Sequence, residues 1–416
     1  MDPRMIKVIL ASQFNDFGKG DLFRKEWQEF LGNSIFTADG EYWQQSRSMI
    51  RPMFLKERIG DLEIFERHIQ SFLTKIPGER QEIEITDLFF RFTLDVTTDF
   101  LLGGCVDSLA NPRADFATAF ADVQRMQNII VRTGAISWLI PRDKFRRGLK
   151  VINTFVNTFI DRTLRLSPEE LDKVAKSDSN YTFLHALARF TRDPKILRDQ
   201  IVATLLASRD TTACTLAWAI WELSAAPDIV ESLRAEILDV VGPFKAPNYA
   251  DLKSMKYLQA ILNETLRLYP AVPFNYRYAI RDCTIPFGGG LDGSQPLSIA
   301  KDDMVVYSTL VMQTNPDFFP PPSKEFPPVE KFAPTRWLHW TPKPWTYVPF
   351  NGGPRVCVGQ QFALTEMGYT LVRMFQKFDK VARKRPSREQ FLKADIVGQP
   401  GAGVHVEFRR AKGEDM

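Results

Sequence analysis

The chain has 416 residues, of which 44% are hydrophobic and 25% are charged; this composition is ordinary for a folded protein and excludes disorder throughout. Lysine and arginine exceed aspartate and glutamate by only 54 − 50 = +4, so no nucleic-acid partner is expected. Aromatic residues make up 12% of the chain and indicate a large core or an apolar pocket. No uncharged apolar run reaches the ~18 residues of a membrane span, and no signal peptide is visible. The chain as written is therefore expected to be cytoplasmic or peripheral to a membrane.

Helical periodicity dominates the first two thirds of the chain. Residues 1–31 read as short helices, and Gly40–Phe54 as an amphipathic helix that follows a turn. Apolar residues at three- and four-residue spacing predict further helices at 85–102, 113–129, 143–165, 181–190, 197–224, 226–241 and 251–268, the last of them ending before Pro270.

The pattern changes after Pro270. Between 272 and 312, short β-branched and aromatic runs alternate with glycines and predict strands. Seven prolines between 315 and 334 predict an irregular segment. A helix is predicted from Gly359 to about Phe378, and a final hairpin and a charged tail are expected after it. The fold class is thus mainly α with a minor β region.

The stretch Phe350–Gly359 is the most informative part of the chain. Its glycines allow a tight turn, and Cys357 falls where the next helix begins, so that free amides and the helix dipole favour a thiolate. Such a thiolate could ligate iron, whereas a lone cysteine is otherwise most often a buried structural residue. The other cysteines (Cys105, Cys214 and Cys283) have no such neighbours, and no CxxC pair indicates a disulfide scaffold or a zinc site.

The spacing Phe-x-x-Gly-x-Arg-x-Cys-x-Gly in this stretch resembles the haem-binding signature of cytochromes P450 at every fixed position. The resemblance implies a P450 fold with haem b as cofactor and Cys357 as the axial ligand of its iron. It also implies that Arg355 pairs with a haem propionate and that Phe350 packs near the sulfur.

Two further motifs resemble the arginine-bearing segments of this family. Trp43 and Arg47 lie one helical turn apart, which in isolation is more often an exposed aromatic–cation pair. In the family a Trp-x-x-x-Arg helix holds a haem propionate. The stretch Val272–Arg277 resembles the strand whose arginine reaches the other propionate. The resemblance thus implies that Trp43, Arg47 and Arg277 bind the cofactor with Arg355.

An acid and an alcohol lie in the middle of the longest apolar helix, in Ala207–Thr212. Both are costly to bury without partners, although a helix kinked by backbone-bonding threonine is compatible with them. In the family, an acid–alcohol pair at this place relays protons to bound dioxygen, which assigns that role to Asp210 and Thr211. Ser208 stands where the family usually has glycine.

Glu264 and Arg267 lie on one face of the helix before Pro270 and alone would read as a solvated surface pair. Phe332–Trp337 resembles the family stretch whose arginine closes an ion triad with that pair. The resemblance implies that Glu264, Arg267 and Arg336 are a structural triad and take no part in catalysis.

The segment Asn15–Phe54 looks most like the fungal group that hydroxylates alkanes and fatty acids. The resemblance implies one haem domain over 1–416, at the endoplasmic reticulum membrane, in which electrons from NADPH-cytochrome P450 reductase and molecular oxygen hydroxylate an apolar substrate at its terminal carbon. Three alternatives stay open, namely a catalytically impaired haem-binding remnant, a P450 of secondary or xenobiotic metabolism, and an enzyme that rearranges peroxides without a reductase.

The resemblance also implies that the family's membrane anchor, first helix and opening strands of the small sheet would precede Met1. A shortened gene model and a natural short isoform would both account for this start. Without those strands, the strands around 272–280 and 303–308 are expected to have open edges.

Overall fold

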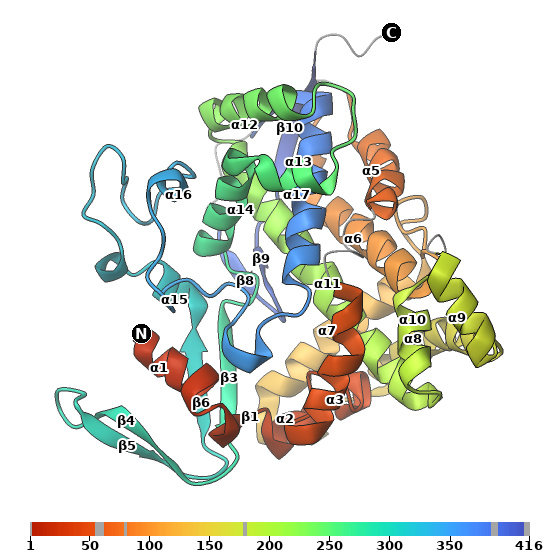
Figure 1. Cartoon of the computed structure of the whole chain (residues 1–416), viewed down its shortest axis with the longest axis vertical. Coiled ribbons are helices and arrows are strands. Elements are labelled where there is room, and N and C mark those ends of the chain that lie inside the picture. Colours follow the sequence, from red (N-terminus) through yellow and green to blue (C-terminus); the bar gives the residue numbers. More distant parts are fainter. Residues whose placement is uncertain (1, 55–61, 79–80, 178–180, 384–389, 412–416) are drawn as a thin grey trace.

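The structure is a computed structural model that describes residues 2–54, 62–78, 81–177, 181–383 and 390–411. Most helices surround the long helix α11, while α1 and the strands β1, β3, β4, β5 and β6 lie together at one side of the molecule (Figure 1). The mainly α fold class with a minor β region is confirmed. The longer helices are α2 (Gly20–Leu31), α3 (Gly40–Ile50), α5 (Glu63–Lys75), α6 (Ile85–Leu102), α7 (Asp115–Thr133), α8 (Asp143–Leu164), α9 (Pro168–Ser177), α11 (Pro194–Leu223), α12 (Pro227–Val240), α14 (Lys256–Leu268) and α17 (Gln360–Lys377).

Short helices connect these elements. They are α1 (Pro3–Lys7), α10 (Phe183–Phe190), α13 (Tyr249–Ser254), α15 (Thr309–Gln313) and α16 (Arg336–His339), the π-helix η1 (Val8–Ser12), and the 3₁₀ turns η2 (Phe14–Asp16), η3 (Arg51–Phe54), η4 (Gly134–Leu139), η5 (Pro316–Phe318) and η6 (Gly353–Arg355).

Helix α11 is the axis of the helical part. It begins at a capped N-terminus, where the Asp193 carboxylate accepts from the amides of Lys195 and Ile196. Its residues are buried on almost every side, as expected for a helix in the middle of a large protein. It packs against α2, α6, α8, α14 and α17. Side chains that are open to solvent near the middle of α11 are therefore exceptions.

The predicted helix 251–268 is wrong in one respect, because the chain forms two helices, α13 and α14, that are separated at Met255. The carboxylate of Glu236, on α12, accepts from the amides of Tyr257 and Leu258 at 2.8 and 2.9 Å. An acidic side chain from another helix thus satisfies free amides of the first turn of α14, which starts a new helix there.

Within the described residues, the strands form four small antiparallel sheets. The orders are β1–β3–β6, β2–β10–β7, β4–β5 and β8–β9, built from β1 (Phe17–Gly18), β2 (Ile83–Glu84), β3 (Phe274–Ala279), β4 (Cys283–Gly289), β5 (Gln295–Ile299), β6 (Met304–Ser308), β7 (Phe378–Ala382), β8 (Leu392–Ala394), β9 (Gly398–Pro400) and β10 (His405–Arg410). The expected final hairpin corresponds to β8–β9, and the charged tail 412–416 lies outside the described residues.

The expectation of open edges holds for β6 and for most of β3. Strand β1 pairs only with the end of β3, with Phe17 opposite Ala279 and Gly18 opposite Tyr278, so in the described part of the chain residues 274–277 keep one unpaired edge. Within the described ranges no strand pairs with the second edge of β6, where Met304 and Val306 are half exposed.

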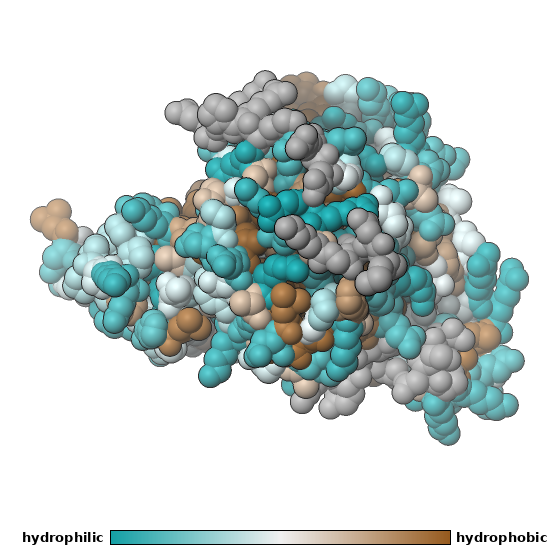
Figure 2. All heavy atoms as spheres, turned by 90° about the horizontal axis from the view of Figure 1, so that it is seen from above, coloured by the Kyte–Doolittle hydropathy of each residue, from teal (hydrophilic) through white to brown (hydrophobic). Residues whose placement is uncertain are grey.

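Many of the aromatic residues belong to the core. Phe54, Phe65 and Phe100 pack around Phe362 of α17, with ring centroids of Phe100 and Phe362 4.6 Å apart and those of Phe65 and Phe362 5.3 Å apart. Phe183 of α10 packs in turn against Phe54. In the part of the chain that the structure covers, no helix combines the length and the apolar character needed to cross a membrane. The face at the α12 end carries mainly hydrophilic residues, with apolar ones in small separate areas (Figure 2).

Candidate cofactor site around Cys357

The loop that carries Cys357 is held in shape by its own backbone. The amide of Cys357 donates to the carbonyl of Phe350 at 2.9 Å, and that of Val356 donates to Gly353 at 3.1 Å. Gly353 has a φ of +67°, and a Cβ on it would lie 1.9 Å from the carbonyl oxygen of Leu10. The loop therefore lies directly against η1, and only glycine fits at residue 353.

Gly353→Ala should destabilise the protein by about 3 kcal/mol, because it combines left-handed strain with a backbone clash. Gly293→Ala is a matched control, since Gly293 has a φ of +74° but no atom within 4 Å of its Cβ position. The control should cost only about 1 kcal/mol. Urea unfolding of both variants measures the difference, and equal losses would show that η1 does not press on the loop.

The sulfur of Cys357 lies in a hollow. Solvent reaches Cys357, which is exposed, yet enough protein surrounds the thiol that desolvation raises its pKa, an effect that the Gly359 amide and the charge of Arg47 oppose. We infer from this combination of exposure and desolvation that Cys357 lies in a recess, here called the hollow. The hollow is bordered by α3, because Nη1 of Arg47 donates to the carbonyl of Val356 at 2.9 Å.

Arg355 and Asp39 connect this loop to the start of α3. A terminal nitrogen of Arg355 donates to the carboxylate of Asp39 and, at 2.9 Å, to the carbonyl of Ala38. The guanidinium stacks over the indole of Trp43 at 4.6 Å. Asp39 also accepts from the amides of Lys19 and Gly20 at 2.9 and 2.8 Å, so one carboxylate binds the starts of α2 and α3 and the cysteine loop.

Cations outnumber carboxylates in this cluster. Desolvation and the nearby charges of Arg277 and Arg355 lower the pKa of Lys19 well below its usual value. Desolvation lowers the pKa of Arg355 to about 10, Asp39 opposes this, and Arg277 and Arg47 add to it. Four basic side chains thus share one carboxylate, and the buried Nε of Arg355 has no hydrogen-bond partner among the described residues. A buried excess of positive charge is costly, so the cluster fits an anionic group.

Arg277 reaches the cluster from β3. It is buried, and its Nη1 donates to the carbonyl of Tyr276 at 2.8 Å and to Asn275 at 3.2 Å. Its guanidinium lies 6.0 Å from the ring of Tyr307, whose hydroxyl donates to Asn351 in the cysteine loop at 2.8 Å. The structure thus brings Trp43, Arg47, Arg277 and Arg355 to one place.

The sequence analysis missed Lys19 and Asp39. Both lie in the segment Asn15–Phe54, which served there only to indicate a subgroup. A signal was available, since each is a charged residue beside a glycine in a turn. Phe350 is partly buried and also lines a pocket of about 140 Å³ behind the loop, with Asn263, Tyr347 and Leu364.

In the middle of α11, Ala207, Ser208 and Thr211 are partly exposed, while their neighbours on other faces are buried. They lie on one face of the helix. The hydroxyl of Thr211 donates to the carbonyl of Ala207 at 2.7 Å. Ser208 makes no hydrogen bond through its hydroxyl to any residue that the structure describes. This face is therefore the partly open side of a helix that is otherwise buried near its middle.

Asp210 does not share the open face of Thr211. It is buried, and its carboxylate accepts from Gln124 of α7 and, at 3.1 Å, from Nη1 of Arg209. Burial raises the pKa of Asp210, which Arg209 and Gln124 oppose. The predicted acid and alcohol are neighbours in the chain, but their side chains are not hydrogen-bonded to each other.

The three residues of the predicted triad meet in a fully buried cluster. Glu264 accepts from Nε of Arg267 at 2.7 Å and from Nε of Arg336 at 3.0 Å, and none of the three is more than 1% exposed. The indole of Trp337 and the amide of Ala333 also donate to Glu264, both at 2.9 Å. The arginines donate in turn to carbonyls of the proline-rich segment, at Pro327, Pro328 and Lys331.

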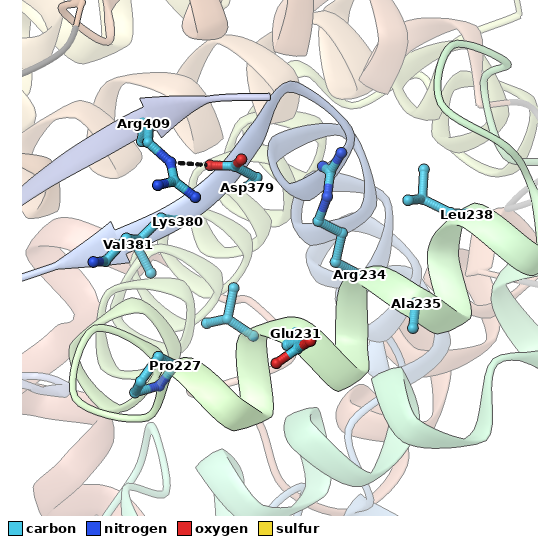
Figure 3. Close-up of a pocket in the computed structure, with 10 residues that line it drawn as sticks. Pro227, Glu231, Arg234, Ala235, Leu238, Asp379, Lys380, Val381 and Arg409 are labelled. Atoms are coloured by element: carbon cyan, nitrogen blue, oxygen red, sulfur yellow. Dashed lines mark hydrogen bonds and ion pairs between the residues drawn. The ribbon is translucent and has the colours of Figure 1, made fainter. Parts of the chain in front are cut away.

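A separate pocket of about 510 Å³ lies far from these residues in the chain, between α12 and the strands β7 and β10 (Figure 3). Arg409 and Asp379 form an ion pair across its wall, with Nε and Oδ1 2.7 Å apart. None of the predicted site residues lines this pocket. It is therefore not part of the candidate cofactor site.

A single cysteine in a hollow, beside an excess of buried cations, is the arrangement expected of one class of protein. Proteins of this class bind an anionic cofactor through a cysteine thiolate. Comparison with known proteins agrees with this geometry. The chain matches the family Cytochrome P450 over residues 1–404, and it belongs to that family.

Three relatives illustrate the similarity. The chain is 49% identical to Cytochrome P450 monooxygenase pvhE of Talaromyces variabilis, over 99% of this chain and 80% of that protein. It is 39% identical to Cytochrome P450 52A1 of Candida tropicalis, over 93% of this chain and 73% of that protein. It is 39% identical to Cytochrome P450 monooxygenase g430 of a Fusarium species, over 91% of this chain and 69% of that protein. The expected likeness to a fungal group is confirmed.

As a cytochrome P450 monooxygenase, the chain is an oxidoreductase of a family that uses O2, a redox partner, and haem with a cysteine thiolate as axial ligand. The residues of the hollow fit that group. Haem carries two carboxylates, and the cluster of Lys19, Arg47, Arg277 and Arg355 has only Asp39 as a counter-charge. Cys357 supplies the sulfur beside it.

Proposed function

We propose that Cys357 ligates the iron of haem b and that Arg47, Arg277, Arg355 and Lys19 hold its propionates, with Trp43 packed on the guanidinium groups. The observation that carries this proposal is the exposed Cys357 beside four basic side chains that share one carboxylate, that of Asp39. Contacts of this hollow with η1, α3 and β3 support one haem-binding unit over 1–416.

When bound, a thiolate-ligated haem supplies the activation of O2 from which one oxygen atom enters an apolar substrate. The chain's own contribution is to exclude water and to place protons. Thr211 Oγ1 is the hydroxyl proposed to deliver a proton at the open face of α11, although it now donates to Ala207. Asp210 is proposed to resupply that proton, since its raised pKa lets the carboxyl hold a proton at higher pH than an exposed aspartate does.

A long-chain alkane or fatty acid, hydroxylated at its terminal carbon, is the proposed substrate. The similarity to proteins named Cytochrome P450 52 supports this substrate, as does the lack of charged side chains on the face of α11 formed by Ala207, Ser208 and Thr211. A P450 of secondary or xenobiotic metabolism is the alternative that would use the same chemistry.

NADPH-cytochrome P450 reductase is the proposed electron donor, and the endoplasmic reticulum membrane the proposed location. An exposed apolar group in η4 supports a peripheral contact with a membrane. Ile136, Trp138 and Leu139 are 59%, 75% and 61% exposed, and the basic residues Arg132 and Arg142 flank them. Aromatic and aliphatic side chains next to arginines are suited to the lipid–water interface.

Haem-loaded chain, reductase and NADPH should convert hexadecane or palmitate to the terminal alcohol. Thr211→Val should lower the rate of product formation about 10²-fold, because the isosteric change removes only the hydroxyl that delivers protons. Thr212→Val is the matched control, since Thr212 is buried and is not placed at the open face. Gas chromatography of the products measures both rates.

Each remaining outcome selects one of the alternatives. Haem loading without turnover of any apolar substrate would favour an impaired haem-binding remnant. Turnover of a hydroperoxide without reductase would favour the peroxide-rearranging class. Equal rates for Thr211→Val and the wild-type chain would remove Thr211 from proton delivery.

A further inference from the structure

The loop between α2 and α3 is attached to the first half of α11. The amide of Asn33 donates to the carboxylate of Asp199 at 2.8 Å, and the amide of Ile35 donates to Oε1 of Gln200 at 3.2 Å. Gly32 has a φ of +55°, and a Cβ on it would lie 2.0 Å from Cγ of Asp199. The loop therefore packs against α11 without space between them.

Gln200 extends this attachment to α3 itself. It is 1% exposed, and its Nε2 donates to the hydroxyl of Ser46 at 2.9 Å and to the carbonyl of Asn33 at 3.4 Å. Since Oε1 accepts from a backbone amide, which can only donate, the orientation of the side-chain amide is defined. A buried glutamine with all its polar atoms bonded holds its partners in one arrangement.

Ser46 immediately precedes Arg47, and the two side chains point to different neighbours. Successive residues of a helix are about 100° apart around its axis. With Ser46 bonded to α11 and Arg47 bonded to the carbonyl of Val356, the rotation of α3 about its axis is set from two sides. Trp43, one turn before Arg47, is set with it.

Gln200, although buried, lies on the same face of α11 as the partly exposed Ala207, Ser208 and Thr211. Ala207, Ser208 and Thr211 follow it by seven, eight and eleven residues, which is the spacing of one helix face. The side chain of Gln200 therefore connects α11, which carries Thr211, to α3, which carries Arg47.

We propose that Gln200, through Ser46, is a positioning residue that orients Arg47 toward the cofactor. This inference rests on the proposed function, in which Arg47 holds a haem propionate. Partners that orient a ligand typically change the affinity of the site about 10-fold or more when they are removed.

The test is the rate at which the haem-loaded full chain loses haem to an excess of apomyoglobin. Gln200→Leu and Ser46→Ala should each raise this rate about 10-fold. Thr204→Val is the matched control on α11, because the hydroxyl of Thr204 bonds only to the carbonyl of Gln200 in its own helix, at 2.8 Å. The control should retain the wild-type rate. If Gln200→Leu does not fold, the rate of haem loss from Ser46→Ala, which is a smaller change, tests the proposal by itself.

The same substitutions in an Arg47→Ala background separate positioning from general loosening. If Gln200 acts through Arg47, Gln200→Leu should add little to the rate of Arg47→Ala. A full additional increase in that background, or wild-type rates for Gln200→Leu and Ser46→Ala, would overturn the proposal on Gln200. A wild-type rate for Arg47→Ala alone would instead refute the role of Arg47 in the proposed function.

Discussion

Replacing Cys357 with alanine should abolish the strongly red-shifted Soret band that the ferrous–CO complex of a thiolate-ligated haem shows. The other described contacts of the hollow come from nitrogen atoms of arginine and lysine and from the carboxylate of Asp39. None of these supplies a thiolate, so the loss should be complete and not partial. The absorption spectrum of the reduced, CO-treated protein measures it directly.

Cys283→Ala is the matched control for this change. Cys283 is partly exposed and lies on β4, where it forms part of the β4–β5 sheet and has no role in the site. This variant should keep both the band and its intensity. A band that survives in Cys357→Ala, or disappears in Cys283→Ala, would show that another residue ligates the iron.

Glu264→Gln should lower the free energy of unfolding by about 3–5 kcal/mol, although it preserves the size of the side chain. Glu264 is fully buried and is the carboxylate that both Arg267 and Arg336 contact. Without its charge, two guanidinium groups stay buried without a counter-ion. The midpoint and slope of urea unfolding measure the loss.

Glu29→Gln is a matched control at the surface. Glu29 likewise contacts two arginines, Arg142 at 2.9 Å and Arg146 at 2.8 Å, but it is 31% exposed. Solvent screens such a pair, so its loss should cost less than about 1 kcal/mol. Similar costs for the two variants would mean that burial does not decide the strength of the Glu264 cluster.

The fold class and the cysteine loop could be predicted from the sequence because their signals are local. The helix periodicity of α8 predicts 143–165, and the structure has Asp143–Leu164. The loop motif is contained in ten consecutive residues, and its glycine pattern corresponds to the close contact of Gly353 with Leu10. The roles of the motif residues in binding and catalysis stay predictions.

Features that depend on distant partners could not be predicted in this way. The break between α13 and α14 follows from Glu236, which lies 21 residues before its partner Tyr257. Strand β1 has two residues, too few for a recognisable alternation, and exists because β3 pairs with it. Gln200 has no distinguishing neighbours in the sequence, and its importance appears only when Ser46 is seen 2.9 Å away.

The bonds that close the hollow around Cys357 join segments that are far apart in the chain. Arg355 and Asp39 are 316 residues apart, and Arg47 and Val356 are 309 residues apart. Contacts of such long range form late, since the entropy of closing the intervening chain must be overcome first. During synthesis, the first 354 residues can leave the ribosome before Arg355 and Val356, which close the hollow, have been made. Asp39 and Arg47 therefore stay without these partners until more than 300 further residues have been added to the growing chain.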